Sequence, residues 1–125
     1  MKSPHKGIKR ILHAFKYSYD GFIAVFKSEA AFRQDLVVFA IGTAAALLLP
    51  FTPMTRAILI SSLLLILLME LVNTAIEVVI DRISDDYHKL SKTAKDIGSL
   101  LVLLSFINAG VIWSIALVQY LGGAN

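Results

Sequence analysis

Charged positions divide this sequence into long apolar stretches and shorter polar ones. Residues 36–55 and 97–125 contain no charged side chain, and residues 57–80 contain only Glu70 and Glu77. Each stretch has the roughly 20 residues that a helix needs to cross a hydrocarbon core about 30 Å thick. The pattern predicts three transmembrane helices, at about residues 33–52, 56–82 and 93–121, with a polar connector at 83–92.

The beginning of the chain has a different pattern. Apolar residues recur at helical spacing between Ile8 and Phe26, while Lys9, Lys16 and Asp20 lie on other faces, and seven basic residues precede Leu36. A basic helix with one apolar face is typical of the membrane interface. We therefore predict an amphipathic surface helix at about residues 5–30, with packing of its apolar face against protein as the alternative.

Composition supports a membrane protein. The 125 residues are 57% hydrophobic and only 17% charged, with a mean hydropathy of +0.72. A soluble domain of this size has too little interior to bury so much apolar surface. The expected fold is one all-α membrane domain over residues 1–125, surrounded by lipid bilayer, with no nucleic acid partner. There is no cysteine, and no cleavable signal peptide is expected because no compact apolar segment follows the basic N-terminus.

Basic residues predict the orientation of the chain. The first 35 residues hold seven Lys and Arg, and the segment from Asp81 to Asp96 holds four, whereas the loop before Ala57 holds only Arg56. The positive-inside rule therefore places the N-terminus and the long connector in the cytoplasm.

The segment "MELVNTAIEVVIDRI" places acids inside a predicted transmembrane helix. At 100° per residue, one face carries Glu70, Asn73, Thr74, Glu77 and Asp81. Ionisable residues within a bilayer are costly and usually functional. The pattern alone leaves three interpretations open: hydrogen bonding between helices, a proton or cation relay, and a site for a metal and phosphates.

Neighbouring residues favour the metal and phosphate interpretation. The segment "AKDIGS" supplies Lys95 and Asp96, and Arg10 and Glu29 are predicted on the same side of the membrane. Carboxylates that bind Mg²⁺ beside bases that bind phosphates are what phosphoryl transfer requires. No P-loop motif and no soluble protein-kinase motif is present, so ATP would bind in a different kind of site.

The segments "SEAAFRQD", "ELVNTAIEVVIDRIS" and "YHKLSKTAKDIGS" resemble those of the prokaryotic integral-membrane diacylglycerol kinases, and the resemblance extends from Ile8 to Trp113. It implies a homotrimeric bundle in the bacterial cytoplasmic (inner) membrane, each subunit having a surface helix and three transmembrane helices. It also implies Mg²⁺-dependent transfer of the ATP γ-phosphate to the primary hydroxyl of diacylglycerol, which gives phosphatidic acid.

The resemblance also implies roles for single residues. Glu70 resembles the catalytic base, and Glu29 and Glu77 resemble the metal ligands. The implied nucleotide contacts are Arg10, Tyr17, Glu29, Asn73, Glu77, Asp86, Tyr87, His88, Lys95 and Asp96. The implied lipid-substrate contacts are Arg10, Ala31, Phe32, Arg33, Gln34, Glu70, Ser99 and Trp113. His88 is alternatively a capping residue, Tyr87 an interfacial anchor and Trp113 a packing residue.

Two other functions remain open at this point. An undecaprenol kinase of the same family would use the same acids on a different lipid alcohol, although "DRIS" and "DIGS" are more similar to the diacylglycerol branch. A small proton-coupled transporter would account for Glu70, but it would leave Lys95 and Asp96 without a role.

Overall fold

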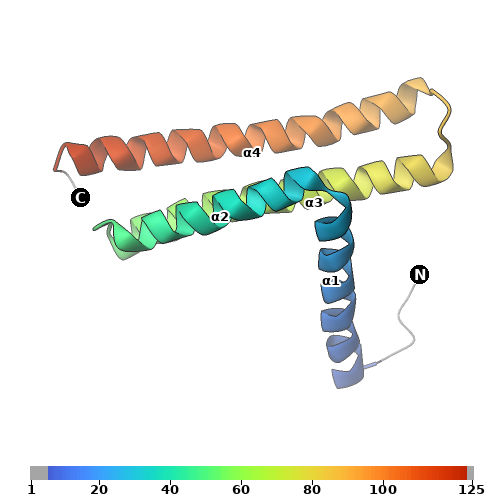
Figure 1. Cartoon of the computed structure of the whole chain (residues 1–125), viewed down its shortest axis with the longest axis horizontal. Coiled ribbons are helices and arrows are strands. Elements are labelled where there is room, and N and C mark those ends of the chain that lie inside the picture. Colours follow the sequence, from blue (N-terminus) through green and yellow to red (C-terminus); the bar gives the residue numbers. More distant parts are fainter. Residues whose placement is uncertain (1–5, 124–125) are drawn as a thin grey trace.

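The computed structural model describes residues 6–123, which form four helices: α1 (Ile8–Ser28), α2 (Ala30–Leu48), α3 (Pro53–Ile83) and α4 (Lys89–Leu121). The last three are long and apolar enough to cross a membrane. α3 packs against both α2 and α4, and α3 and α4 run antiparallel (Figure 1). The predicted class of fold, an all-α multi-pass membrane protein with three spans, is confirmed.

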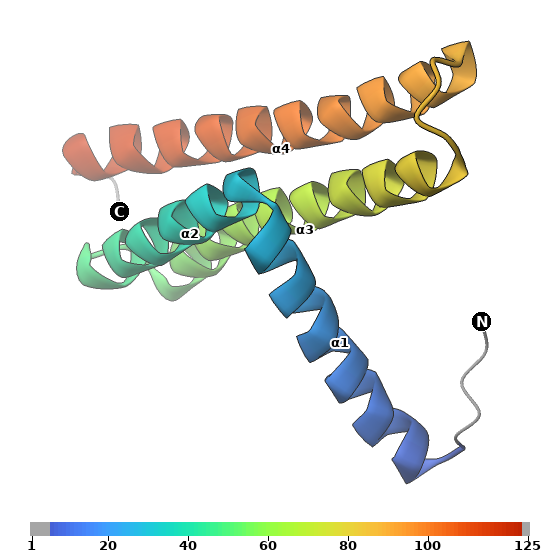
Figure 2. The same ribbon diagram turned by 45° about the vertical axis from the view of Figure 1, so that its right-hand side comes forward.

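α1 leaves the three-helix bundle at a steep angle, as Figures 1 and 2 show. The helix stops because Glu29 adopts an extended conformation, with φ −117° and ψ 106°. Arg33 of α2 donates from Nη1 to the carbonyls of Phe26 (2.6 Å) and Lys27 (3.3 Å) and so caps the end of α1. Phe32 is buried with its ring edge against Phe22. These contacts fix the corner between the surface helix and the first span.

Capping residues decide where the other helices begin. The Thr52 hydroxyl accepts from the Thr55 N–H at 3.2 Å, and Pro53 occupies the first turn of α3. His88 Nδ1 accepts from the Leu90 N–H at 3.1 Å, so α4 begins at Lys89, four residues before the start expected from the charge pattern. Absence of charge marks the lipid-crossing part of a helix, whereas caps mark its true end.

The apolar contacts lie in the half of the bundle that is far from the connector. One cluster contains Ala46, Phe51, Leu59 and Ala116, and a second contains Leu63, Ile66 and Ala109. Many large apolar side chains on the outside of the bundle are exposed, as expected for surfaces that meet lipid or another subunit. The helices are thus held together mainly by the packing of α3 against its two neighbours.

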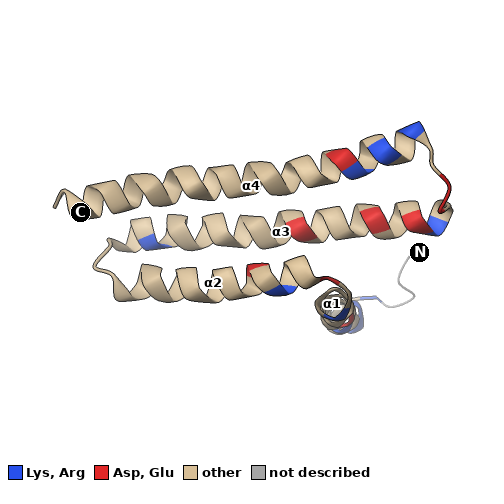
Figure 3. Cartoon of the chain, turned by 45° about the horizontal axis from the view of Figure 1, so that its top comes forward, with Lys and Arg blue, Asp and Glu red and all other residues tan. Residues whose placement is uncertain are grey.

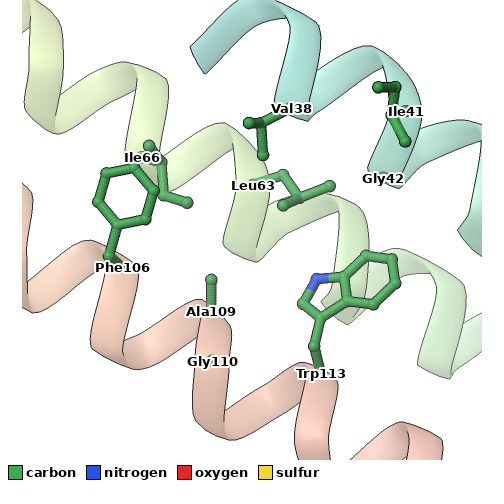
Figure 4. A pocket seen from close by; sticks show the side chains of 9 residues that line it. All are labelled: Val38, Ile41, Gly42, Leu63, Ile66, Phe106, Ala109, Gly110 and Trp113. Carbon is green, nitrogen blue, oxygen red and sulfur yellow. The ribbon is translucent and has the colours of Figure 1, made fainter. Parts of the chain in front are cut away.

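An apolar pocket of about 420 Å³ lies among the three spanning helices (Figure 4). Figure 4 shows Val38 and Ile41 of α2 above Leu63 of α3, with Phe106, Ala109 and Trp113 of α4 below. The remaining lining residues are Gly42, Ile66 and Gly110. Because Ile66 is one helical turn from Glu70, the pocket adjoins the level of the polar stripe.

Candidate active site

Glu70 faces a second acid across the α2–α3 contact. Both side chains are buried, Glu70 being 7% exposed and Asp35 of α2 8% exposed. Their carboxyl groups lie within hydrogen-bonding distance of each other. No ion pair found among residues 6–123 includes either acid. The centre of the site is therefore a buried pair of carboxyl groups without a paired base.

One turn further along α3, an amide is hydrogen-bonded to the next acid of the polar stripe. Asn73 Nδ2 donates to Glu77 Oε1 at 3.3 Å, and Asn73 Oδ1 is buried without a hydrogen-bond partner among residues 6–123. The backbone of α4 approaches closely at Gly98, where an added Cβ would collide with Asn73 Oδ1. A glycine is thus needed on α4 for the helices to meet at the height of Asn73.

Glu29 and Glu77 lie near enough to Glu70 to act on it electrostatically. Glu29 is half-buried at the junction of α1 and α2, and Glu77 is half-buried on α3. Within the described part of the chain, no three acids or histidines come together as a complete metal cage. Two carboxylates that would share a cation with phosphates and water fit the usual way in which Mg²⁺ is bound.

Charged residues gather where α3 and α4 are joined, as Figure 3 shows. Lys95 Nζ pairs with Asp81 at 2.7 Å and ties α4 to α3, while Lys92 pairs with Asp96 at 2.7 Å within α4. A pocket of about 380 Å³ lies at this end. Its lining residues are Ile80, Asp86, Tyr87, His88, Ser91, Lys92, Lys95 and Asp96. Five of the residues expected to contact the nucleotide therefore share one pocket.

Other expected site residues are not brought together in the single chain. Arg10 and Tyr17 are exposed on α1, the helix that leaves the bundle in Figure 2. Ser99 is exposed on α4, and Ala31 and Gln34 are exposed in the first turns of α2. Their nucleotide and lipid contacts stay predictions.

Four further residues have structural contacts. Phe32 and Arg33 hold the α1–α2 corner, as described above. Trp113 lines the apolar pocket and donates from Nε1 to the Ser62 hydroxyl at 3.2 Å. His88 caps α4 through Nδ1, which leaves Nε2 as its second ring nitrogen. These contacts do not test whether the residues also touch a substrate.

Sequence reasoning missed two residues of this site. Asp35 ends the charged stretch before the first span, and a count of charge-free residues starts after it. Gly98 lies within "AKDIGS", but its role depends on the distance between two helix backbones. Asp35 carries one available signal, because at 100° per residue it follows Phe32 on the buried face of α2.

Together these features define a class of protein: a multi-pass α-helical membrane protein with a buried acid pair and a charged pocket at one end of its bundle. Comparison with known proteins gives the family. The family model described as prokaryotic diacylglycerol kinase matches residues 16–117.

Curated relatives are similar over nearly their whole length. The diacylglycerol kinase of Escherichia coli K12 is 43% identical over 116 residues, covering 93% of this chain and 95% of the relative. That of Pseudomonas aeruginosa is 43% identical over 119 residues, covering 93% and 97%. That of Helicobacter pylori is 36% identical over 110 residues, covering 86% and 84%. This chain belongs to the prokaryotic diacylglycerol kinase family and is a lipid kinase of that family.

Proposed function

We propose that this protein transfers the γ-phosphate of ATP to the primary hydroxyl of 1,2-diacylglycerol, giving phosphatidic acid. The observation that carries the proposal is the buried Glu70 carboxyl on a membrane-spanning helix, in line with a charged pocket at the helix end. The hydroxyl of a lipid alcohol lies near the membrane interface, so a base that reaches it has to lie within the bilayer. The names of the relatives from E. coli and P. aeruginosa support this choice of lipid.

Glu70 is the general base of the proposed reaction. Its carboxylate takes the hydroxyl proton as the lipid oxygen attacks the γ-phosphorus of ATP. A new O–P bond forms, the bond from the γ-phosphorus to the β,γ-bridging oxygen breaks, and ADP leaves with that oxygen. Burial between α2 and α3 keeps bulk water from competing with the lipid hydroxyl as acceptor.

The nucleotide binds at the connector end of the bundle. The pocket beside Asp86, Tyr87, His88, Lys95 and Asp96 has room for part of a nucleotide, and the Lys95 ammonium would exchange its pairing with Asp81 for a phosphate. Asn73 lies between this pocket and Glu70 along α3, so its amide would contact the γ-phosphate. Arg10 and Tyr17 of α1 complete the proposed contacts.

Glu29 and Glu77 would hold Mg²⁺ beside the phosphates. The donor set fits this ion, because two half-buried carboxylates lie near enough to Glu70 to act on it electrostatically, and Mg²⁺ is commonly bound by one or two carboxylates together with substrate phosphates. When bound, Mg²⁺ neutralises charge on the phosphates. The hydrogen bond from Asn73 orients the Glu77 carboxylate for this role.

The lipid substrate would approach Glu70 from the apolar side. The apolar pocket one turn away, with Ile66 and Trp113 in its lining, suits an acyl chain. Arg10, Ala31, Gln34 and Ser99 would contact the lipid more directly, whereas Phe32 and Arg33 would act chiefly by holding the corner between α1 and α2.

We further propose a homotrimer in the bacterial inner membrane with a cytoplasmic N-terminus. The basic residues of α1 and of the connector support this orientation. The exposed apolar faces of the spanning helices leave surface for further subunits. A partner subunit would also help to enclose ATP, because α1 carries Arg10 and Tyr17 away from its own bundle.

A substrate comparison tests the proposal. Purified protein in mixed micelles is given Mg·ATP with diacylglycerol, with undecaprenol or without lipid, and lipid phosphate is measured. We expect turnover with diacylglycerol that stops when Mg²⁺ is chelated. Phosphorylation of undecaprenol alone would assign the sister activity instead, and absence of any lipid-dependent turnover would contradict the proposed reaction.

A further inference from the structure

We propose that Asp35 is a positioning residue for the base: its carboxyl shares one proton with Glu70 in a hydrogen bond, and this bond fixes the Glu70 carboxyl for catalysis. This inference rests on the proposed function of Glu70. It adds a residue from α2 to a reaction that the sequence assigned to acids of α3 and of the α1–α2 junction.

The contact between the two acids requires a proton. A carboxylate only accepts hydrogen bonds, so two carboxyl groups within hydrogen-bonding distance form a bond only if one of them is protonated. Two ionised carboxylates at that separation, both more than nine-tenths buried, would repel each other strongly. A shared proton removes this repulsion and makes the contact attractive.

The surroundings of the pair also favour a retained proton. The acids that face Glu70 are Asp35 from α2, Glu29 from the α1–α2 junction and Glu77 from its own helix. α4 approaches this face through Gly98, and Lys95, three residues before it, is paired with Asp81. With one acid of the pair ionised and no base among the described residues paired with either, a second ionised carboxyl in this place would be costly.

Geometry assigns the two roles within the pair. Asp35 has a short side chain on the buried face of α2, and its Oδ2 is buried with no donor from the described residues. Glu70 has a longer side chain and lies on the stripe that leads through Asn73 to the charged pocket. A hydrogen bond between Asp35 and one Glu70 oxygen leaves the other Glu70 oxygen to take the proton of the lipid hydroxyl.

Protons balance over the proposed cycle. The pair begins with one proton and one negative charge. The lipid hydroxyl loses its proton to Glu70 while its oxygen forms the bond to phosphorus, so the pair then holds two protons. One of these is released to water after the products leave, which restores the starting state. The single proton released is the one that the lipid hydroxyl lost.

The test compares three variants of the full-length protein in mixed micelles. Asp35→Leu keeps the branched shape of the side chain without a donor, Asp35→Asn keeps a donor without a titrating group, and Asp35→Glu keeps the carboxyl. Since misplacement of a reacting group costs about 100-fold, we expect kcat to fall by about that factor in Asp35→Leu while KM for Mg·ATP stays close to wild type. Asp35→Asn and Asp35→Glu should recover most of the lost kcat. Asp20→Asn, on the exposed face of α1, is the matched control.

A spectroscopic readout detects the proton itself. Infrared difference spectra at neutral pH should show the C=O stretch of a protonated carboxylic acid in wild-type protein and in Asp35→Glu, but not in Asp35→Asn. A merely structural role for Asp35 would instead lower Tm in Asp35→Leu without this spectral difference. If Asp35→Leu does not fold, the kcat values of the Asn and Glu variants and the infrared band still test the inference.

Several outcomes would overturn the inference. Wild-type kcat in Asp35→Leu, equal loss in the Asn and Leu variants, or no protonated band in wild-type protein would each do so. These outcomes differ from failure of the proposed function, in which the wild-type protein itself would not phosphorylate diacylglycerol.

Discussion

Two successive parts of α3 bury different kinds of side chain. Residues 59–67 bury Leu59, Leu63 and Ile66 in apolar clusters, and their buried polar residue, Ser62, donates to the Leu59 carbonyl (2.6 Å) and accepts from Trp113. Residues 70–77 bury Glu70 against another acid and leave Asn73 Oδ1 without a partner. Unpaired buried polar atoms cost stability, so the first part is built for packing and the second retains groups for a reaction.

The largest expected effect follows from removing the proposed base. Because a general base contributes a factor of about 100 to 10,000, Glu70→Gln should reduce kcat by at least about 100-fold. Gln cannot take the hydroxyl proton, although it has nearly the same shape as Glu. Initial-rate measurements of phosphatidic acid formation at saturating Mg·ATP give this quantity.

Nucleotide binding provides the control for that variant. Glu70 lies apart from the charged pocket, so Glu70→Gln should bind Mg·ATP with a Kd near that of wild type in calorimetry. Substantial turnover by Glu70→Gln would show that the base is a different group, and loss of nucleotide binding would show that residues 70–77 act as a single binding unit.

A second acid on the same helix should give a different kinetic signature. Glu77→Gln removes a proposed Mg²⁺ ligand. An interaction with a charged group contributes about 1.5–3 kcal/mol, so KM for Mg·ATP should rise by about 10- to 100-fold. The rise should be partly reversed by high Mg²⁺ concentration, measured as a magnesium titration at fixed ATP. An unchanged KM would remove Glu77 from the metal site.

The close approach of α4 at Gly98 allows a third test of the difference between the two parts of α3. Gly98→Ala would push against Asn73 Oδ1 and disturb the hydrogen bond from Asn73 to Glu77. We expect kcat/KM to fall by about tenfold, the size of a loss of about 1.4 kcal/mol. Gly21→Ala on α1 is the control, because an added Cβ there meets nothing within 4 Å and Gly21 lines neither the apolar nor the charged pocket. Equal activity of the two variants would contradict a role for this contact.

The matching substitution in the apolar part should affect packing more than activity. Gly42→Ala would meet the Cδ1 end of Leu63, a flexible side chain that can rotate away. Overpacking costs about 1–3 kcal/mol, and replacing a helical glycine by alanine recovers about 1 kcal/mol. We therefore expect a small decrease in Tm with KM for Mg·ATP unchanged. A large loss of kcat would show that the apolar part also controls the reaction.

These contrasts explain which features the sequence could predict. The spans and the stripe of Glu70, Asn73 and Glu77 depend on spacing within one helix, so charge and periodicity were enough to predict them. The contact of Asp35 with Glu70, and that of Gly98 with Asn73, depend on how two helices pack. Spacing along one helix carries no information about the facing helix, so neither contact was predicted.

Arg33 has a structural contact that the sequence did not predict. The family resemblance implied a lipid contact, which stays a prediction, and the structure adds that the guanidinium caps the carbonyls of Phe26 and Lys27. A sequence shows that a charged residue lies near the membrane surface, but not which unsatisfied carbonyls lie within its reach. Because α1 ends before Glu29, those carbonyls have no donor from a continuing helix. This is visible only in the folded corner.

The smallest expected effect concerns the ion pair that joins α3 and α4 beside the charged pocket. Lys95 and Asp81 are 2.7 Å apart, but their side chains are 41% and 61% exposed, and exposed pairs contribute little to stability. Asp81→Asn should therefore leave Tm within error of wild type in thermal unfolding. Its KM for Mg·ATP should change by less than about tenfold, below the effect of Glu77→Gln, because the same arithmetic needs about 1.4 kcal/mol for a factor of ten. A rise as large as that of Glu77→Gln would show that Asp81 orients Lys95 toward the phosphates, and would extend the reactive part of α3 to the end of the helix.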